Sequence, residues 1–128
     1  MSQPLRLLLA DDEETFLRAT AELLRDAGYH CDMASDGCQA FDMLLANRYD
    51  LLIADLQMAG NMNFELLEKV ELIAPGMPVI TVTGYPSLAS AIRAVELPVV
   101  AYLVKPFDFD ELLDRITRAI RRAQPDRP

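Results

Sequence analysis

Five side chains that can do chemistry lie at or just after the ends of short apolar runs in this sequence. They are Asp11 and Asp12, Asp55, Thr83 and Lys105. A run of four or five apolar residues between polar ends is typical of a buried parallel strand. The carboxyl ends of parallel strands share one edge of a sheet, which is where open α/β sheets bind ligands. We therefore expect three carboxylates, a hydroxyl and an ammonium group on one small surface.

Such a group of carboxylates favours a cation. Two unit charges about 4 Å apart repel by roughly 4 kcal/mol at an effective dielectric constant near 20. Oxygen ligands suit Mg²⁺, or Mn²⁺ in its place, and Mg²⁺ usually keeps several waters and accepts phosphate oxygens. Lys105 adds a positive charge without filling a metal position.

A divalent ion and a lysine beside one strand-end aspartate indicate nucleophilic catalysis by a carboxylate. Asp55 is the candidate nucleophile, which would attack phosphorus and carry an aspartyl phosphate. The metal and Lys105 would stabilise the charge on the transferred oxygens, and Thr83 would bond the new phosphoryl group.

The elements that position these residues alternate along the chain. Strands are predicted at 5–10, 29–34, 51–55, 79–83 and 99–104. Apolar residues at helical spacing predict a helix between each strand and the next and one after the last, with breaks at Gly28, Ala74–Pro78 and Leu97–Pro98. Pro86 and Ser87 open the fourth helix, which carries Leu88, Ile92 and Val95 on one side.

Five strand–helix units without a repeat or linker predict a parallel sheet covered on both faces. With 128 residues the chain is too short for a barrel of about 250, so we expect an α/β, flavodoxin-like open sheet of order 2-1-3-4-5 in three layers. Residues 1–124 would form the domain, and 125–128 a tail or the start of a linker.

Composition excludes some functions for this segment. The formal charge is −8, so direct binding to nucleic acid or to an anionic membrane is not expected. Leu5–Ala10 is too short for a signal peptide, and we expect a cytoplasmic protein. Cys31 and Cys38 lack metal-ligand spacing and are interpreted as reduced, structural residues. His30, the only histidine, is interpreted as a surface residue away from the site.

Four segments together resemble the response-regulator receiver domains of two-component signalling. They are Leu7–Asp12, Leu52–Met58, Ile80–Gly84 and Tyr102–Phe107, and the resemblance covers roughly residues 5 to 122. Each segment alone is weak evidence, but the order and separation of all four are specific for this family.

The resemblance implies a role for each matching residue. Asp55 resembles the phosphoacceptor, and Asp11 and Asp12 the metal-binding acids, with the main-chain carbonyl of Gln57 completing the protein's share of the metal shell. Lys105 resembles the phosphate-contacting lysine, before a peptide bond to Pro106 that is typically cis.

The resemblance also implies a switch and its partners. Thr83 and Tyr102 resemble a pair in which the hydroxyl moves to the phosphoryl group and the ring turns inward. This changes the face made by the fourth helix, the fifth strand and the fifth helix, which would act on an output domain or partner and could form a homodimer. The implied donor is a histidine kinase or a histidine phosphotransfer protein. A switch that catalyses its own phosphorylation and dephosphorylation is not a classical enzyme.

The sequence departs from the family pattern at three places. Ala59–Asn63 replaces the usual loop after the phosphoacceptor strand, Leu97–Val100 replaces a Gly-Ala turn, and the bulky Tyr85 follows Thr83 by two residues. The first departure bears on how partners approach Asp55 and how long its phosphate survives. Tyr85 would screen an acyl phosphate from water.

Two other functions remain open from the residues alone. The same fold with a vestigial acidic edge would be a phosphorylation-independent binding module. A phosphohydrolase would need a general acid near the nucleophile, and Gln57, two residues after Asp55, cannot donate a proton usefully. The sequence shows no output segment, which leaves a stand-alone receiver and part of a longer protein as alternatives.

Overall fold

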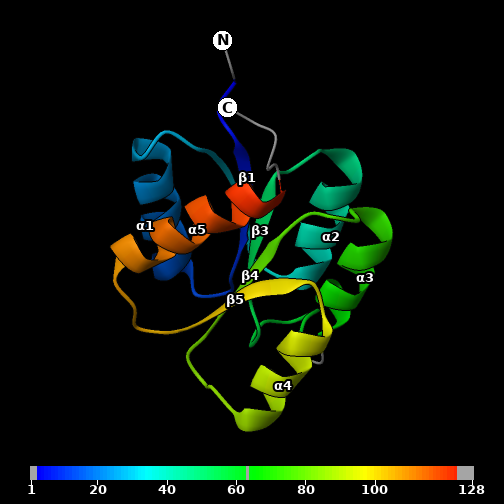
Figure 1. Cartoon of the computed structure of the whole chain (residues 1–128). Helices are drawn as coiled ribbons and strands as arrows, with labels where there is room; N and C mark the ends of the chain where they lie inside the picture. Colours follow the sequence, from blue (N-terminus) through cyan, green and yellow to red (C-terminus); the bar gives the residue numbers. More distant parts are fainter. Residues whose placement is uncertain (1–2, 63, 124–128) are drawn as a thin grey trace.

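The computed structural model describes residues 3–62 and 64–123, and the predicted tail at 125–128 lies outside them. Five parallel strands alternate with five helices, and the strand order β2-β1-β3-β4-β5 confirms the predicted topology (Figure 1). The strands are β1 (Arg6–Ala10), β2 (His30–Ala34), β3 (Leu51–Asp55), β4 (Val79–Thr83) and β5 (Val99–Val104). The helices are α1 (Glu14–Asp26), α2 (Gly37–Ala46), α3 (Glu65–Ile73), α4 (Leu88–Glu96) and α5 (Phe109–Ala123).

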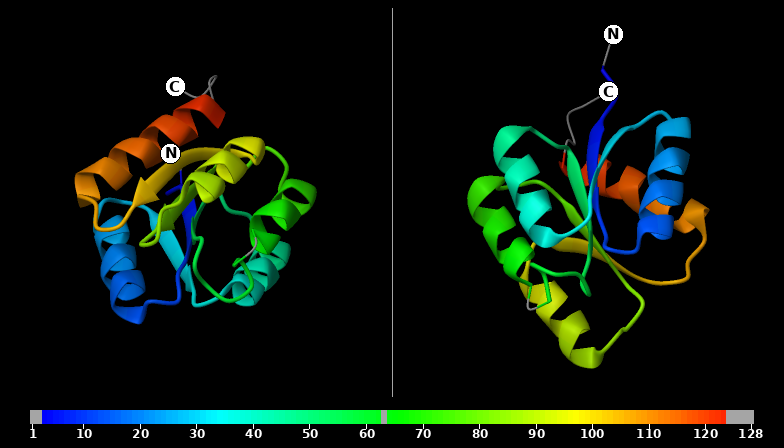
Figure 2. Two further views of the ribbon diagram at one scale, coloured as in Figure 1. Left: turned by 90° about the horizontal axis from the view of Figure 1, so that it is seen from below. Right: turned by 180° about the vertical axis from the view of Figure 1, so that it is seen from behind.

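The central strands are buried along their whole length. Every residue of β3 and β4 is buried, because helices cover both faces of the sheet, whereas β5 lies at its edge and is only partly covered. Leu7 and Leu9 of β1 pack into the cluster that includes α1 and α5, and the alternating Leu8 and Ala10 into the one that includes α2 and α3. Figure 2 shows these two helical layers on opposite faces of the sheet.

Helix α4 is packed differently from the other four. Its N-terminus carries a capping box in which the side chains of Ser87 and Ser90 each bond the other residue's backbone N–H, so the predicted helix start is confirmed. Its only buried residue is Ala94. The apolar side noted in the sequence faces solvent, with Leu88 78%, Ile92 54% and Val95 83% exposed. The helix therefore buries one small side chain, that of Ala94, rather than these large ones.

None of the helices within the described residues is both long and apolar enough to cross a membrane.

The loop between β3 and α3 is held against the start of α2 by a close backbone approach. The Gly37 N–H donates to the Ala59 carbonyl at 2.7 Å. A Cβ on Gly37 would lie 2.5 Å from the carbonyl oxygen of Gly60, which itself has a left-handed backbone at φ +83°. Glycine is therefore required on both sides of this contact.

We expect Gly37→Ala to lower the free energy of unfolding by about 1–3 kcal/mol, because the added methyl group forces two backbones apart. Chemical denaturation measures this. Gly84→Ala is the matched control, since an added Cβ there meets nothing within 4 Å and its φ is not positive. Equal stability of the two variants would show that the loop yields to the methyl group without cost.

Candidate functional site

Four adjacent strands end at the same edge of the sheet (Figure 2, left), and the five predicted residues lie at or just after these ends. The strand register pairs Asp55 with Val82 and Thr83 with Val104, so residues at the ends of β3, β4 and β5 lie side by side. Burial separates them: Asp11, Asp55 and Thr83 are buried, whereas Asp12 is exposed. The expectation that strand ends gather these residues is therefore met.

Three carboxylates form a candidate metal site. One oxygen each from Asp11, Asp12 and Asp55 can be chosen so that all lie within 4.8 Å of one another. Two of these groups are buried, which strengthens their repulsion. A set of carboxylate oxygens with no nitrogen or sulfur ligand fits Mg²⁺ or Mn²⁺, the metals predicted from the sequence.

Lys105 forms ion pairs with acids of the site. Its Nζ lies 2.7 Å from Asp11 Oδ2, 3.6 Å from Asp55 Oδ2 and 3.4 Å from Glu13 Oε1. The peptide bond from Lys105 to Pro106 is cis, as the resemblance implied, and the Lys105 N–H donates to the Thr83 carbonyl at 2.8 Å. The backbone thus fixes the base of a side chain that reaches two of the three carboxylates.

The charges on this edge shift two pKa values. Burial raises the pKa of Asp11 from its ordinary 3.8 to about 6, and nearby Asp55 adds to this, although hydrogen bonds from Lys105 and from the Glu13 N–H oppose the shift. Burial lowers the pKa of Lys105, but its bond to Asp11 and the charges of Asp11 and Asp55 outweigh this and raise it overall. Lys105 therefore stays charged while Asp11 holds a proton more readily than an exposed acid.

The backbone after β3 turns back on Asp55. The Gln57 N–H donates to Asp55 Oδ1 at 2.9 Å, which leaves Oδ2 as the oxygen nearer Lys105. The two oxygens of one carboxylate thus meet different partners. That the Gln57 carbonyl serves as a metal ligand stays a prediction.

Among the described residues, the predicted switch residues Thr83 and Tyr102 bond to other partners and not to each other. Thr83 Oγ1 accepts from the Tyr85 N–H at 3.0 Å. The Tyr102 hydroxyl is 2.6 Å from Ser90 Oγ, in the capping box of α4. Tyr102 is half-buried and packs beside the α2–α3 core cluster. Ser90 is thus a third member of this region that the sequence alone did not single out.

Other residues complete the site without a signal in the sequence. The Phe16 ring lies 4.2 Å from Lys105 Nζ, and the Phe107 ring packs edge-on against it at 6.0 Å. Both rings, with Tyr85, line a cleft that also contains Asp55 and Lys105. Phe16 has the helical spacing of a core residue, so only the three-dimensional structure reveals its contact with the lysine.

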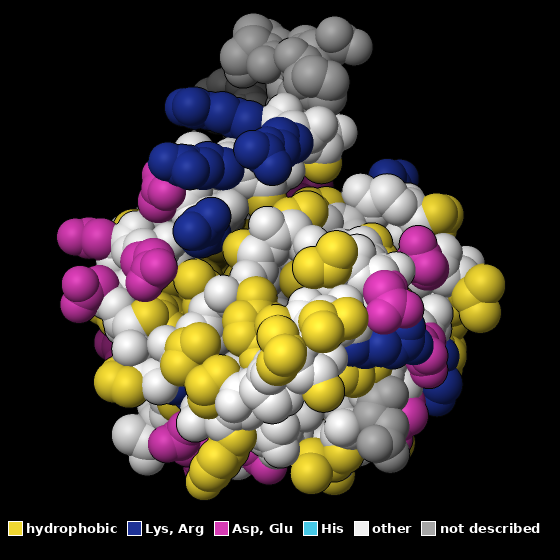
Figure 3. Space-filling view, turned by 60° about the horizontal axis from the view of Figure 1, so that its bottom comes forward, with side chains coloured by type: hydrophobic (Ala, Val, Ile, Leu, Met, Phe, Trp, Pro, Cys, Tyr) yellow, Lys and Arg dark blue, Asp and Glu magenta, His cyan; other side chains and the backbone are white. Residues whose placement is uncertain are grey.

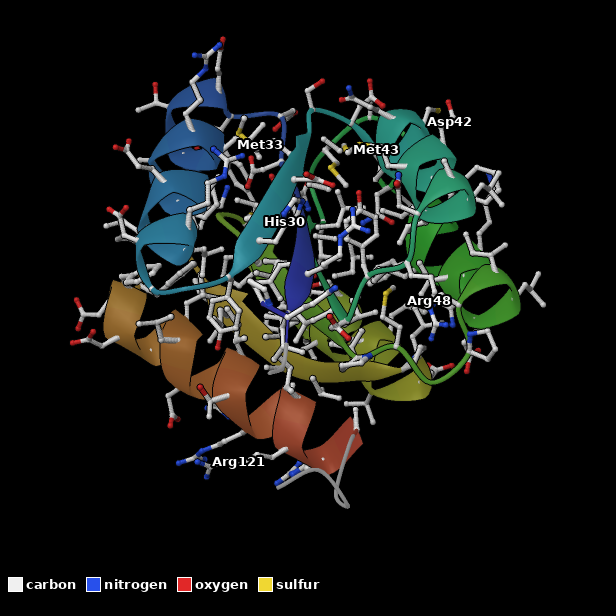
Figure 4. The ribbon with its side chains drawn as sticks, turned by 90° about the horizontal axis from the view of Figure 1, so that it is seen from above. His30, Met33, Asp42, Met43, Arg48 and Arg121 are labelled. Atoms are coloured by element: carbon white, nitrogen blue, oxygen red, sulfur yellow. The ribbon has the colours of Figure 1, made fainter. Side chains whose placement is uncertain are left out.

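His30 takes no part in the site. It is exposed at the start of β2, on the opposite edge of the sheet, where Nε2 is 3.2 Å from Asp32 Oδ1 (Figure 4). The interpretation of His30 as a surface residue is confirmed.

Comparison with known proteins agrees with this geometry. The family model described as response regulator receiver domain matches residues 7–117. The transcriptional regulatory protein GlrR of Escherichia coli (strain K12) is 32% identical over 123 residues, which are 96% of this chain and 28% of that protein. The chain spans about a quarter of the length of such curated relatives.

Solved structures match along nearly the whole chain. A CheY-like receiver domain from Methanospirillum hungatei JF-1 has a TM-score of 0.93 and 27% identity and covers 98% of this chain and 100% of that one. The beryllofluoride-activated NtrC4 receiver domain dimer has a TM-score of 0.86 and 25% identity, over 92% and 98% of the two chains.

The raised pKa of Asp11 predicts how stability depends on pH without metal. The folded protein holds this proton more tightly than the unfolded chain. The resulting stabilisation is full below pH 3.8 and is lost as the pH rises through about 6. Between pH 5 and pH 7.5 we expect wild type to lose about 1 kcal/mol more unfolding free energy than Asp11→Asn.

Urea denaturation at both pH values measures this difference. Asp42→Asn, which changes an exposed acid on α2 far from the site, should keep the wild-type dependence. Equal pH dependence in wild type and Asp11→Asn would contradict the assignment of the proton to Asp11.

Proposed function

The chain belongs to the response regulator receiver domain family, and we propose that it is a phosphoacceptor switch. In this proposal Asp55 accepts a phosphoryl group from a phosphohistidine donor, with Mg²⁺ or Mn²⁺ bound by Asp11, Asp12, Asp55 and the Gln57 carbonyl. The donor is a histidine kinase or a histidine phosphotransfer protein in the cytoplasm. The module is a signalling domain rather than a classical enzyme.

One observation carries this proposal. A nearly buried carboxylate, Asp55, stands between two further acids and a lysine, with Oδ2 at 3.6 Å from Lys105 Nζ. A buried carboxylate kept beside like charges costs stability, so its presence favours a chemical role over a structural one. This arrangement also argues against a vestigial edge, because the acids and the lysine remain within reach of one another.

The chemistry is an in-line displacement at phosphorus. A lone pair of the Asp55 carboxylate forms the new O–P bond, and the electrons of the breaking P–N bond return to the imidazole nitrogen of the donor. Lys105 faces the charge that develops on the transferred oxygens, and a divalent ion held by the three carboxylates would further neutralise that charge. Phe16 and Phe107 limit the access of water around the lysine.

The response is carried by Thr83 and Tyr102. The Thr83 hydroxyl, now accepting from the Tyr85 N–H, is free to donate its own proton to a phosphoryl oxygen. The Tyr102 hydroxyl is hydrogen-bonded to Ser90 of α4. An inward movement of the Tyr102 ring therefore either breaks this bond or shifts α4 with the ring. The phosphoryl group thereby biases a two-state equilibrium of the face formed by α4, β5 and α5.

We expect wild type incubated with a small acyl-phosphate donor and Mg²⁺ to gain the mass of one phosphoryl group, as an acid-stable, base-labile adduct. Asp55→Asn should gain none, because an amide is not a nucleophile of this kind. Intact-mass spectrometry measures the adduct.

Asp42→Asn should be labelled like wild type, and omission of Mg²⁺ should suppress labelling. An adduct on Asp55→Asn, or none on wild type, would end the proposal.

The exposed apolar side of α4 is the surface we propose for a second copy of the chain after phosphorylation. Hydrophobic side chains gather on this face (Figure 3), and α5 carries arginine side chains. Besides Leu88, Ile92 and Val95 of α4, the edge strand exposes Val100 and Val104. Exposed apolar patches of this kind mark interaction sites, and the similar NtrC4 receiver was solved as a dimer in its activated form.

We expect Val95→Asp to weaken self-association of the phosphorylated protein at least tenfold, because a charge would be buried in an apolar contact. Its free energy of unfolding should change by less than about 0.5 kcal/mol, since Val95 is exposed. Analytical ultracentrifugation with and without the phosphoryl donor measures the association. Leu72→Asp is the matched control, because Leu72 on α3 is equally exposed at 83%. A phosphorylated protein that stays monomeric, or Val95→Asp that associates like wild type, would overturn this surface.

A further inference from the structure

Asn61 is a polar side chain that is completely buried in the loop between β3 and α3. This is the loop in which the sequence departs from the family pattern, although its last residue, Asn63, lies outside the described residues. Burial of an amide without partners would cost several kcal/mol. The contacts that offset this cost therefore indicate what the residue does.

Both ends of the Asn61 amide are used. Nδ2 donates to the main-chain carbonyl of Asp55 at 3.0 Å, and Oδ1 accepts from the Leu66 N–H at 3.2 Å. The Asn61 backbone also bonds locally, since its N–H donates to the Met58 carbonyl at 3.0 Å. One side chain thus bridges the residue proposed as nucleophile and the first turn of α3.

The start of α3 is held in part by the Asn61 side chain. Its N-cap position is Phe64, which has a left-handed backbone at φ 63° and makes no capping hydrogen bond with its side chain. The N–H groups of a first helical turn need partners from outside the helix. Asn61 Oδ1 is such a partner for the Leu66 N–H. Because Asn61 Nδ2 also bonds the Asp55 carbonyl, the start of α3 is tied to the end of β3.

These bonds enclose the segment that carries the proposed metal ligand. Asp55 is held by Asn61 at its carbonyl, and the Leu56 N–H donates to the Val82 carbonyl at 3.0 Å. Met58, fully buried, is held by the Asn61 N–H. Gln57 lies between these anchored residues, so the direction of its carbonyl depends on them.

We propose that Asn61 is a positioning residue that fixes the Asp55–Met58 backbone and so orients the Gln57 carbonyl toward the divalent ion. The inference rests on the proposed function, because it assigns Asn61 to the same metal-dependent site. Asn61 touches neither the ion nor the phosphoryl group and acts only through the main chain.

Only an amide meets both requirements at this position. An aspartate would keep the acceptor for the Leu66 N–H but would place an oxygen against the Asp55 carbonyl, and it would add a buried charge near three acids. An alanine would lose both bonds and leave the Asp55 carbonyl without this partner. Asn61→Asp and Asn61→Ala therefore remove the same bond to Asp55 in two different ways.

The test measures Mg²⁺ affinity directly, by isothermal titration calorimetry of wild type and variants. We expect the Kd for Mg²⁺ to rise about tenfold or more in Asn61→Ala and Asn61→Asp, since residues that orient metal ligands typically affect affinity by about 10–100-fold. At saturating Mg²⁺ and donor, the maximal labelling rate of Asn61→Ala should stay within about threefold of wild type. A misdirected ligand weakens binding of the metal more than it slows chemistry once the metal is bound.

Two control variants separate positioning from a general loss of stability. Val70→Ala removes buried side-chain atoms from the middle of α3 and lowers stability without touching the loop. Asn47→Ala removes an amide that donates to the Met43 carbonyl at 3.2 Å, on the exposed end of α2. Both should bind Mg²⁺ like wild type.

A readout without metal completes the design. The Leu66 amide hydrogen should exchange faster in Asn61→Ala, which lacks the acceptor, than in wild type. Asn61→Asp keeps an acceptor for this N–H, so faster exchange there would mean that the loop itself is distorted. Val70→Ala provides the comparison for global opening. Mg²⁺ affinity within twofold of wild type in both Asn61 variants overturns the inference, as does an equal loss in Val70→Ala. Wild type that binds no Mg²⁺ overturns the proposed function instead, so the two failures are distinguishable.

Discussion

The repulsion among the three carboxylates at the end of the sheet is the constraint on which the rest of the structure depends. Asp11 and Asp55 are buried beside each other, and the exposed Asp12 adds a third charge. Lys105 is the cation that contacts Asp11 and Asp55 among the described residues, and its three short contacts to acids offset part of this repulsion. The domain therefore carries an electrostatic cost at its site that a bound divalent ion would relieve. The same cost makes the site responsive, because any change of charge there alters the stability of its surroundings.

The fold tolerates this cost because the rest of the sheet is built from apolar side chains packed on both faces. The strands β3 and β4 are buried throughout, and the two core clusters lie on opposite faces of the same sheet. The acids stand at the very ends of these strands, where the apolar layers stop. A rigid scaffold with an unfavourable edge is the arrangement in which functional residues are expected to lie.

Much of this could be predicted from the sequence, and the rest had a physical reason to stay hidden. The strands are short apolar runs, and parallel pairing necessarily brings their ends together, so Asp11, Asp55, Thr83 and Lys105 could be assembled without a structure. The contact of Phe16 with Lys105 could not, because its helical spacing is that of a core residue and the partner lies far away in the sequence. Asn61 was hidden for a related reason: a polar residue in a loop looks exposed until the loop is seen to fold over it. In α4, periodicity identified an apolar side but not which way it faced, since the helix buries only Ala94 and leaves its large apolar residues in solvent.

The light packing of α4 supports its proposed role as the element that responds to the site. Ala94 is its only buried residue, and its first turn is closed by a capping box made within the helix itself. Movement of α4 therefore exposes little apolar surface and breaks no cap, so two positions of this helix can differ by a small free energy. The hydrogen bond between Tyr102 and Ser90 joins α4 to β5, and the neighbouring strand β4 ends in Thr83. By contrast, α3 is tied to Asp55 through a buried amide and packs three residues into the core, so a change at Asp55 meets a stiff element on one side and a compliant one on the other. In the proposed switch, this difference in packing would direct a signal from Asp55 toward α4 rather than α3.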